Sequence, residues 1–136
     1  MKNKFGFILV KPQLGENIGS CARSLKNFGF SKLDIVYPKQ MWPNSKAKAT
    51  SVGAFDILKK AKIFTDTHDA VSYYDLVISL SARKRDINKR HISIEQFLKI
   101  INNKKNTKFG LMFGPEASGL SNEDLSLSNY VLQIPT

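Results

Sequence analysis

One segment, residues 17–30, combines polar residues with an interrupted helical pattern. It reads NIGSCARSLKNFGF, and its apolar residues recur every three or four positions, which predicts a helix with Asn17 as N-cap and Gly29 at its end. Gly19 fits poorly, because glycine inside a helix costs about 1 kcal/mol relative to alanine. Arg23 lies four residues later and should lean over Gly19. A cation above a bare first turn suits an anion such as phosphate; the alternative is a surface arginine beside a glycine that packs closely on a strand.

A second candidate site is the glycine-rich segment Phe113–Asp124, FGPEASGLSNED. It follows a predicted strand, and we expect its backbone N–H and C=O groups to approach a ligand closely. Glu116 can accept hydrogen bonds from backbone or from a partner arginine, and Ser121 should cap a short helix. The plain alternative is a turn followed by a helix cap. The patterns GxGxxG and GxxxxGK[ST] are both missing, so neither a standard dinucleotide fold nor a P-loop is indicated.

Charge supplies a third signal. The chain carries 21 Lys and Arg against 11 Asp and Glu, a net charge of +10, which favours a polyanionic partner such as RNA or DNA. A lysine-rich proteome is the alternative explanation. The basic segment Ser81–His91 directly follows a predicted strand, where open α/β sheets bind ligands, and guanidinium groups suit phosphate. We therefore expect RNA contacts from its cations, unless it is only a solvated loop: Arg83, Lys84, Arg85, Lys89 and Arg90.

Strands and helices alternate along the chain, which predicts an α/β fold with a mostly parallel sheet. The expected strands are Phe5–Val10, Leu33–Tyr37, Asp75–Leu80, Phe109–Phe113 and Tyr130–Ile134, with a shorter one at Lys62–Thr65. The expected helices, besides the opening segment, are Gly53–Ala61 with an earlier start possible, Thr67–Tyr74, and Ile94–Asn102 capped by Ser93.

Composition bounds the remaining possibilities. A chain of 136 residues with 42% hydrophobic residues suits a single domain spanning residues 1–136. Cys21 is the one cysteine, so an intramolecular disulfide is impossible, and with only His68 and His91 beside it we expect no metal site. The chain shows neither a membrane-spanning apolar run nor a signal-peptide pattern, so the cytoplasm is the expected location.

Together these segments resemble one family. The segment NIGSCARSLKNFGF resembles the first motif, and LMFGPEASGLSNEDL the second, of the SpoU/TrmH-type SPOUT RNA 2′-O-ribose methyltransferases. The segment SLSARKRD is similar to the TrmJ-like members that act on tRNA. The resemblance covers nearly the whole chain.

The resemblance implies an α/β fold with a C-terminal trefoil knot, a homodimer, S-adenosylmethionine as methyl donor, and tRNA or another structured RNA as substrate. It also implies catalytic roles for Asn17, Arg23 and Glu116. The cofactor-binding residues that it implies are Leu80, Gly114, Pro115, Gly119, Leu120 and Ile134. On this interpretation Gly19 leaves room for RNA.

Methyl transfer to a ribose 2′-OH requires alignment of donor and acceptor and removal of a proton. A guanidinium stays charged in proteins, so Arg23 suits a clamp on the adjacent phosphate and a stabiliser of the developing alkoxide better than a base. Asn17 would then orient the ribose or fix the loop, Glu116 would orient Arg23, within the chain or from a second subunit, and the proton would pass to phosphate or water.

One departure from the family concerns the third motif, which follows the last strand with a turn and a final helix. Here the sequence ends in LQIPT. We therefore expect a fragment of a longer protein or a degraded product, with an incomplete knot. Alone, it should bind S-adenosylmethionine weakly or not at all, lack methyltransferase activity, form a weaker dimer and keep part of its RNA affinity.

Two other functions stay open at the level of sequence. One is a catalytically inactive RNA-binding module. The other is an α/β domain that binds a nucleotide or phosphate without methyltransferase chemistry, such as a flavodoxin-like regulator. The regulator lacks support, because FILVKP shows no acidic cluster at the end of the first strand.

Overall fold

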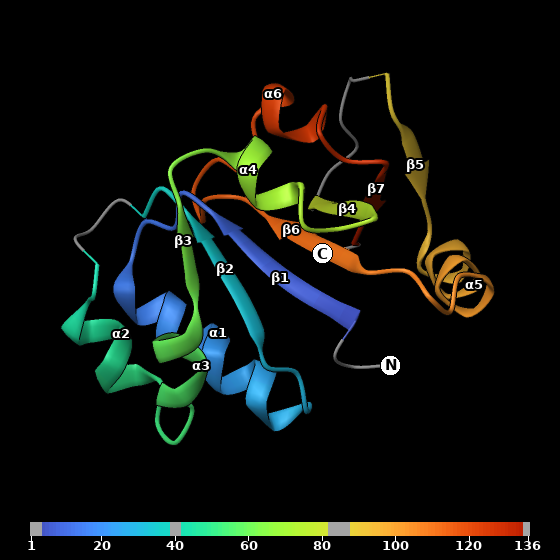
Figure 1. Cartoon of the computed structure of the whole chain (residues 1–136). Helices are drawn as coiled ribbons and strands as arrows, with labels where there is room; N and C mark the ends of the chain where they lie inside the picture. The colour runs from blue at the N-terminus through green and yellow to red at the C-terminus, as the bar shows by residue number, and fades with distance from the viewer. Residues whose placement is uncertain (1–3, 39–41, 82–87, 135–136) are drawn as a thin grey trace.

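A seven-stranded sheet forms the centre of the molecule, in the order β3-β2-β1-β6-β4-β7-β5 (Figure 1). A computed structural model describes residues 4–38, 42–81 and 88–134, and every strand pairing in these ranges is parallel. This confirms the predicted α/β class. The strands are β1 (Phe5–Val10), β2 (Lys32–Val36), β3 (Lys62–Phe64), β4 (Leu76–Ser81), β5 (Arg90–Ile92), β6 (Phe109–Phe113) and β7 (Tyr130–Gln133).

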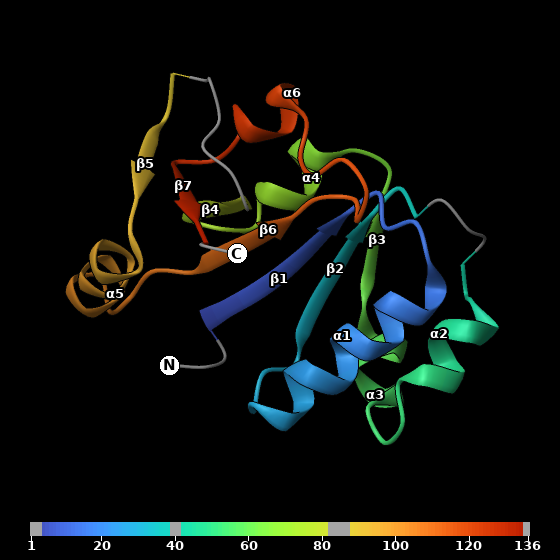
Figure 2. The same cartoon turned by 180° about the vertical axis from the view of Figure 1, so that it is seen from behind.

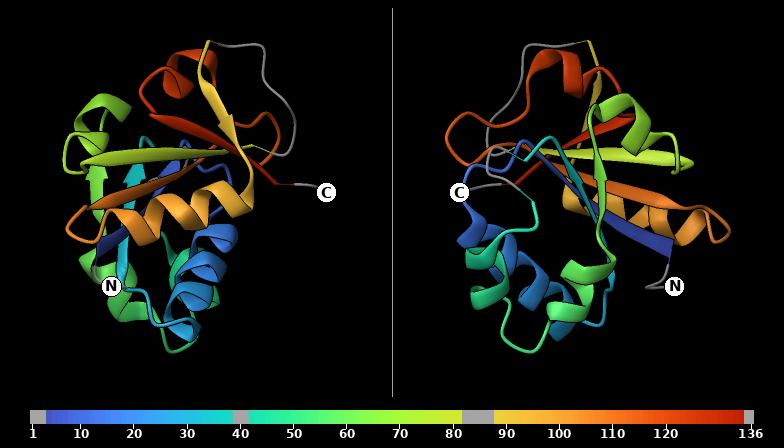
Figure 3. Two further views of the ribbon diagram at one scale, coloured as in Figure 1. Left: turned by 90° about the vertical axis from the view of Figure 1, so that its right-hand side faces the viewer. Right: turned by 60° about the vertical axis from the view of Figure 1, so that its left-hand side comes forward.

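Helices cover both faces of the sheet (Figures 2 and 3). One face packs against α1 (Gly15–Asn27), α2 (Ser45–Thr50), α3 (Phe55–Lys60) and α5 (Ile94–Asn103). The other packs against the short helices α4 (Thr67–Val71) and α6 (Asn122–Leu125). Side chains alternate along a strand, and β1 shows the result: Phe7 and Leu9 pack under α1, whereas Ile8 and Val10 pack under α4 and α6. A strand buried on both faces must be apolar throughout, as FGFILV is.

The observed elements match most of the predicted ones. The bounds of β1 and β6 are those predicted, and the helix α5 begins at the predicted cap, where Ser93 and Gln96 form a complete capping box. The expected helix Gly53–Ala61 is confirmed as α3, which runs from Phe55 to Lys60. It has no earlier start, because Val52 and Gly53, which both have positive φ, separate it from α2, a short helix that was not predicted. The strand β5 was not predicted, because its three residues lie at the end of the basic segment and gain their extended form from pairing with β7.

The side chain of Tyr74 packs directly over two glycines of the sheet. Gly6 and Gly110 are opposite each other in neighbouring strands. A Cβ atom at Gly6 would lie 1.8 Å from the hydroxyl oxygen of Tyr74, and one at Gly110 would lie 2.9 Å from its ring. The hydroxyl donates a 2.6 Å hydrogen bond to the carboxylate of Asp34, which is only 1% exposed. Close contact with Tyr74 therefore requires glycine at both positions.

This buried pair has shifted protonation equilibria. Burial raises the pKa of Asp34, and the hydrogen bond from Tyr74 and the nearby Lys32 and Lys62 lower it in part. Burial and the adjacent carboxylate raise the pKa of Tyr74. The second carboxylate oxygen of Asp34, Oδ1, is buried without a hydrogen-bond partner among the described residues. The charged form of Asp34 is therefore less favourable in the folded protein than it is in water.

The raised pKa of Asp34 should make stability depend on pH. The folded state holds this proton to higher pH than the unfolded chain, so its contribution to the free energy of unfolding is complete below about pH 4 and is lost as pH rises through the folded pKa. Urea unfolding of the wild type and of Asp34→Asn should show the wild type losing stability relative to the variant as pH rises. Tyr74→Phe should enlarge that loss, because the hydrogen bond to the charged form is gone. A difference between wild type and Asp34→Asn that is constant with pH would contradict this assignment.

Candidate active site

The carboxyl ends of three neighbouring strands, β6, β4 and β7, lie side by side at one end of the sheet. The end of β4 lies beside the end of β7, where Leu80 pairs with Leu132 and the Ile134 N–H donates to the Ser81 carbonyl at 2.9 Å. On the other side of β4, the strand β6 ends at Phe113, directly before Gly114. The carboxyl edge of an open parallel sheet is where such folds bind ligands. The structure thus brings together three of the predicted cofactor residues, Leu80, Gly114 and Ile134.

The glycine-rich loop after β6 folds tightly on itself. A Cβ atom at Gly114 would lie 2.2 Å from the backbone nitrogen of Leu120, and Gly119 has a φ of 71°. The Gly119 N–H donates to the Pro115 carbonyl at 2.9 Å. Leu120 is 2% exposed and packs in the core, so it can offer a ligand only its backbone. Bare loop backbone beside the half-buried Leu80 and the partly exposed Ile134 fits a ligand with both apolar and polar parts.

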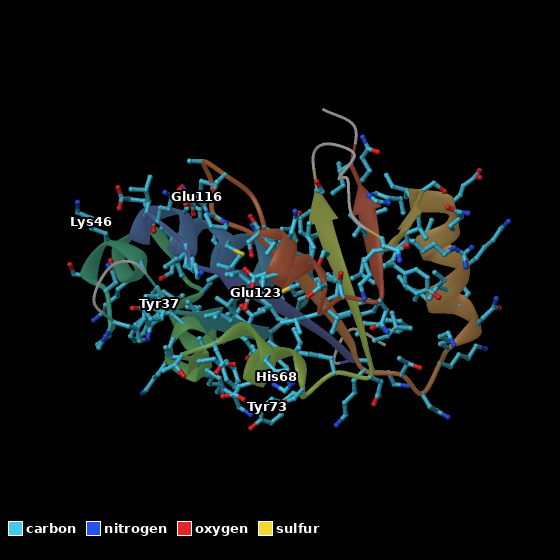
Figure 4. The ribbon with its side chains drawn as sticks, turned by 90° about the horizontal axis from the view of Figure 1, so that it is seen from above. Tyr37, Lys46, His68, Tyr73, Glu116 and Glu123 are labelled. Atoms are coloured by element: carbon cyan, nitrogen blue, oxygen red, sulfur yellow. The ribbon has the colours of Figure 1, made fainter. Side chains whose placement is uncertain are left out.

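A reciprocal pair of hydrogen bonds joins this loop to the loop before α1. The Gln13 N–H donates to the Glu116 carboxylate at 2.9 Å, and the Ala117 N–H donates to the Gln13 side-chain oxygen, also at 2.9 Å. Glu116 lies above the start of α1 in Figure 4. Of the two partners proposed for Glu116 from sequence, backbone and arginine, the structure shows backbone. The part played by Gln13 was not predicted, and no sequence pattern marks it.

The helix α1 begins three residues earlier than expected. Its N-cap is Leu14, which provides no side-chain hydrogen bond, and Asn17 lies within the first turn, so the prediction of Asn17 as N-cap was wrong. The preceding loop is held by Gln13 and Glu116 instead. The side chain of Asn17 is exposed and remains accessible to a substrate. The predicted end of the helix is confirmed, since Gly29 follows the C-cap with a φ of 84°.

The interpretation of Gly19 as a space for RNA was also wrong, because α2 occupies that space. A Cβ atom at Gly19 would lie 1.9 Å from the Thr50 hydroxyl and 2.2 Å from the Ala47 carbonyl oxygen. The Thr50 hydroxyl also donates to the Glu16 carbonyl of α1 at 3.0 Å. Gly19 therefore serves close packing, as its alternative interpretation held, but against a helix rather than a strand.

Arg23 is exposed on α1. Its Cα lies about 12 Å along the helix from Gly15, at 1.5 Å per residue, whereas Glu116 contacts the loop before the helix. Among the residues that the structure describes, no hydrogen bond or ion pair joins Arg23 to Glu116. The structure therefore does not bring Arg23 and Glu116 into contact within one chain.

The basic segment is described only in part. Arg83, Lys84 and Arg85 lie outside the described residues. Arg90 begins β5, and its guanidinium carbon lies 5.8 Å from the centre of the Tyr130 ring. It also lines a cavity of about 310 Å³ with Lys99 and Lys104 of the α5 region. Lys99 and Lys104 were not predicted as site residues. The other lining residues of this region, at positions 96, 100 and 103, recur at intervals of three or four, as residues on one face of a helix do.

A second crevice lies at the carboxyl ends of β1, β2 and β3. Its volume is about 780 Å³, and Tyr37, His68 and Glu123 stand around it in Figure 4. Its lining also includes Asp66 and Asp124. Three carboxylates repel the phosphates of RNA, so this crevice is a poor site for a polyanion. In the described ranges no cluster of three or more His, Cys, Asp or Glu side chains is placed to hold a metal ion.

The fold and the site at the carboxyl ends of the strands define a class of protein. It is a parallel α/β domain in which a glycine-rich loop and a polar helix start are joined at those strand ends. The chain belongs to the SpoU rRNA Methylase family, whose sequence model matches residues 4–136. This confirms the family resemblance drawn from the two motifs.

Individual relatives indicate which members of the family the chain is similar to. The chain is 38% identical over 133 residues to the tRNA (cytidine-2′-O-)-methyltransferase TrmJ of Methanocaldococcus jannaschii, covering 95% of this chain and 56% of that protein. The crystal structure of TrmJ from Z. mobilis ZM4 superimposes with a TM-score of 0.89 at 37% identity, covering 96% of this chain and 58% of that one. AviRb, a SpoU methyltransferase from Streptomyces viridochromogenes solved with AdoMet, shares the fold, with a TM-score of 0.71 at 18% identity, over 100% of this chain and 53% of its own.

The chain spans about half the length of the curated relatives it matches. None of the helices in the described ranges is long and apolar enough to cross a membrane.

Replacing Gly19 with alanine tests the contact between α1 and α2. In open space, alanine would stabilise the helix by about 1 kcal/mol. Here the new methyl group meets the Ala47 carbonyl, which cannot move without shifting α2, so the free energy of unfolding should instead fall by about 1–3 kcal/mol. Ser20→Ala, at the exposed neighbouring position, should change stability by less than about 0.5 kcal/mol. Stabilisation by Gly19→Ala in urea unfolding would show that α2 does not pack on this glycine.

Replacing Gln13 with alanine tests the link between the two loops. Hydrogen–deuterium exchange at the Ala117 N–H should accelerate, since its acceptor is lost, while the melting temperature changes little because the bond is exposed and worth about 1 kcal/mol. Glu123→Gln, an exposed acidic position on α6, is the control and should leave that exchange unchanged. Exchange at Ala117 that is as slow in Gln13→Ala as in the wild type would rule out the reciprocal bond in solution.

Proposed function

We propose that this chain forms the methyl-transfer domain of an S-adenosylmethionine-dependent tRNA 2′-O-ribose methyltransferase. The observation that carries the proposal is the contact of Gln13 with Glu116 and Ala117, which joins the loop just before the first family motif to the second motif across more than 100 residues of sequence. The TrmJ relatives, which are tRNA 2′-O-methyltransferases, support the reaction and the substrate class. Membership of the SpoU rRNA Methylase family speaks against a nucleotide-binding regulator without methyltransferase chemistry.

The residues at the carboxyl edge fit the proposed cofactor. When bound, S-adenosylmethionine supplies a methyl group on a positively charged sulfur. A nucleophile attacks that methyl group in line with the carbon–sulfur bond. We assign Leu80 and Ile134 to its apolar parts, because both place aliphatic side chains at adjacent strand ends with some exposure. The tight loop contributes backbone groups at Gly114, Pro115, Gly119 and Leu120.

Arg23 and Asn17 are the residues that we assign to the RNA. Both are exposed on α1, whose first turn adjoins the glycine-rich loop through Gln13. Arg23 would hold the phosphate next to the reacting ribose and stabilise the developing alkoxide, and Asn17 would orient the ribose hydroxyls. A permanently charged guanidinium cannot accept the hydroxyl proton, so the proton passes to the phosphate or to water.

Glu116 has a different role in this proposal. Its carboxylate is engaged by the Gln13 backbone, so within one chain it positions the loop rather than the arginine. Orientation of Arg23 by Glu116 would require a second copy of the chain. We propose a homodimer on this ground and on the family resemblance, and we place the enzyme with its tRNA substrate in the cytoplasm.

RNA should also contact the basic cavity beside β5. Arg90, Lys99 and Lys104 line it together, and none of the described residues in its lining carries a carboxylate. Lys89 directly precedes Arg90. The predicted contacts of Arg83, Lys84 and Arg85 fall in the same segment, outside the described residues, and stay predictions.

The proposal is tested by Arg23→Ala and Arg23→Lys in the chain joined to the remaining sequence of a TrmJ relative. Transfer of a labelled methyl group to tRNA should fall by about a hundredfold in Arg23→Ala, and lysine should restore little because it lacks the planar fork. The melting temperature should stay near that of the wild type, since Arg23 is exposed. Ser24→Ala, also exposed on α1, is the matched control.

Full activity in Arg23→Ala would remove Arg23 from the site. No activity in the wild-type hybrid, with tRNA binding retained, would favour the inactive RNA-binding module. The unextended chain should bind RNA but show no turnover, and turnover by the unextended chain would overturn the expectation that the third motif is required.

A further inference from the structure

An apolar cavity of about 530 Å³ opens between α2 and α3. Figure 1 shows these two helices side by side, at the end of the molecule farthest from α5. The principal lining residues are Trp42, Pro43, Lys48, Phe55, Leu58 and Lys59. The methyl-transfer reaction proposed above uses none of them.

The lining combines flat rings with positive charge. Trp42 is half-buried, Phe55 is 42% exposed, and the Lys48 ammonium lies 4.9 Å from the centre of the Phe55 ring. Lys59 adds a second cation, and no acidic residue lines the cavity within the described part of the chain. Aromatic rings stack with unpaired nucleobases, and neighbouring cations bind the attached phosphates. A small acid would contact only the cations, and a neutral apolar ligand would contact only the rings. A nucleotide contacts both.

The cavity adjoins the helix that carries Arg23. Asn44, a lining residue and the N-cap of α2, packs on the first turn of α1, where a Cβ atom at Gly15 would lie 2.2 Å from its side-chain oxygen. On the other side of the cavity, Asp56 follows Phe55 and forms a 2.8 Å ion pair with Lys26 of α1. Both walls of the cavity are therefore tied to α1, so an RNA bound along that helix can place a neighbouring nucleotide here.

We propose that this cavity binds an unpaired nucleotide of the RNA substrate, adjacent to the nucleotide that is methylated. The base packs against Trp42 and Phe55, and its phosphates contact Lys48 and Lys59. The proposal rests on the proposed function for the identity of the RNA as substrate, but the binding itself requires neither cofactor nor catalysis.

Trp42 is the only tryptophan of the chain, so its fluorescence reports directly on the cavity. The experiment titrates the unextended chain, without S-adenosylmethionine, with a single-stranded oligouridine of about ten nucleotides. Wild type should show saturable quenching. Phe55→Ala should weaken the apparent affinity about tenfold, the loss of one stacking contact. The double variant Lys48→Gln, Lys59→Gln should flatten the salt dependence by up to about two units of slope.

The control variant is Phe28→Ala, which removes a phenylalanine that is 69% exposed outside the cavity and should leave the titration unchanged. Ribose 5-phosphate, which has no base, should not quench. Absence of saturable quenching, or equal affinity in Phe55→Ala and wild type, would overturn the proposal. Equal quenching by polyglutamate would overturn it in favour of an acidic protein partner. Quenching by oligouridine in a protein that fails the methylation assay would leave this site standing while the proposed reaction falls.

Discussion

Parallel pairing of the strands is the constraint on which the rest of the structure depends. Because all described pairings are parallel, the loops that follow β1, β4, β6 and β7 leave the sheet at the same edge. Each parallel connection must cross a face of the sheet, which places helices on both faces and buries the strands between them. The chemistry-bearing segments are distant in sequence, and this one geometric rule brings them to a common edge.

The helix α1 converts that arrangement into a defined surface. It packs on the sheet through residues such as Ile18 and Ala22, on α2 through Gly15 and Gly19, and beside α3 through the ion pair of Lys26 with Asp56. An exposed ion pair contributes little energy, so the close glycine contacts are the ones that fix the helix. The remaining side carries Asn17 and Arg23 toward solvent. Glycine in the first motif thus supports Asn17 and Arg23, which we propose to contact RNA, only indirectly, by letting α2 pack closely against α1.

Local patterns predicted the fold well where the signal lies within a few residues. The continuous apolar runs of β1 and β6 and the capping box at Ser93 are such signals. The prediction failed where the deciding partner is remote. Gly19 faces Thr50, some thirty residues away. The local sequence around a glycine is the same whether the space beside it is empty or filled by another helix. Likewise, Asn17 is a good capping residue by type, but a loop a hundred residues later sets the start of α1.

The candidate site shows the same division. Its participating segments could be named from their motifs, because phosphate chemistry needs guanidinium groups and close backbone approach needs glycine. The contacts between the segments could not be named, because each bond joins a side-chain oxygen of Gln13 or Glu116 to a backbone N–H about a hundred residues away, and every residue type except proline has such an N–H. The aromatic cavity was equally hidden, since Trp42 and Phe55 belong to different elements and meet only when α2 and α3 pack.

The pairing of β1 with β6 has a consequence for synthesis of the protein. Phe5 pairs with Phe109, so one side of β1 has no partner until β6 has left the ribosome. At about 5–20 residues per second the interval is roughly 5–20 s. In that interval the first three strands and α1 to α3 are already available to form a half-sheet, whose open edge is an apolar strand of the kind that aggregates. The open side of β1 is therefore exposed to mispairing until β6 completes the sheet.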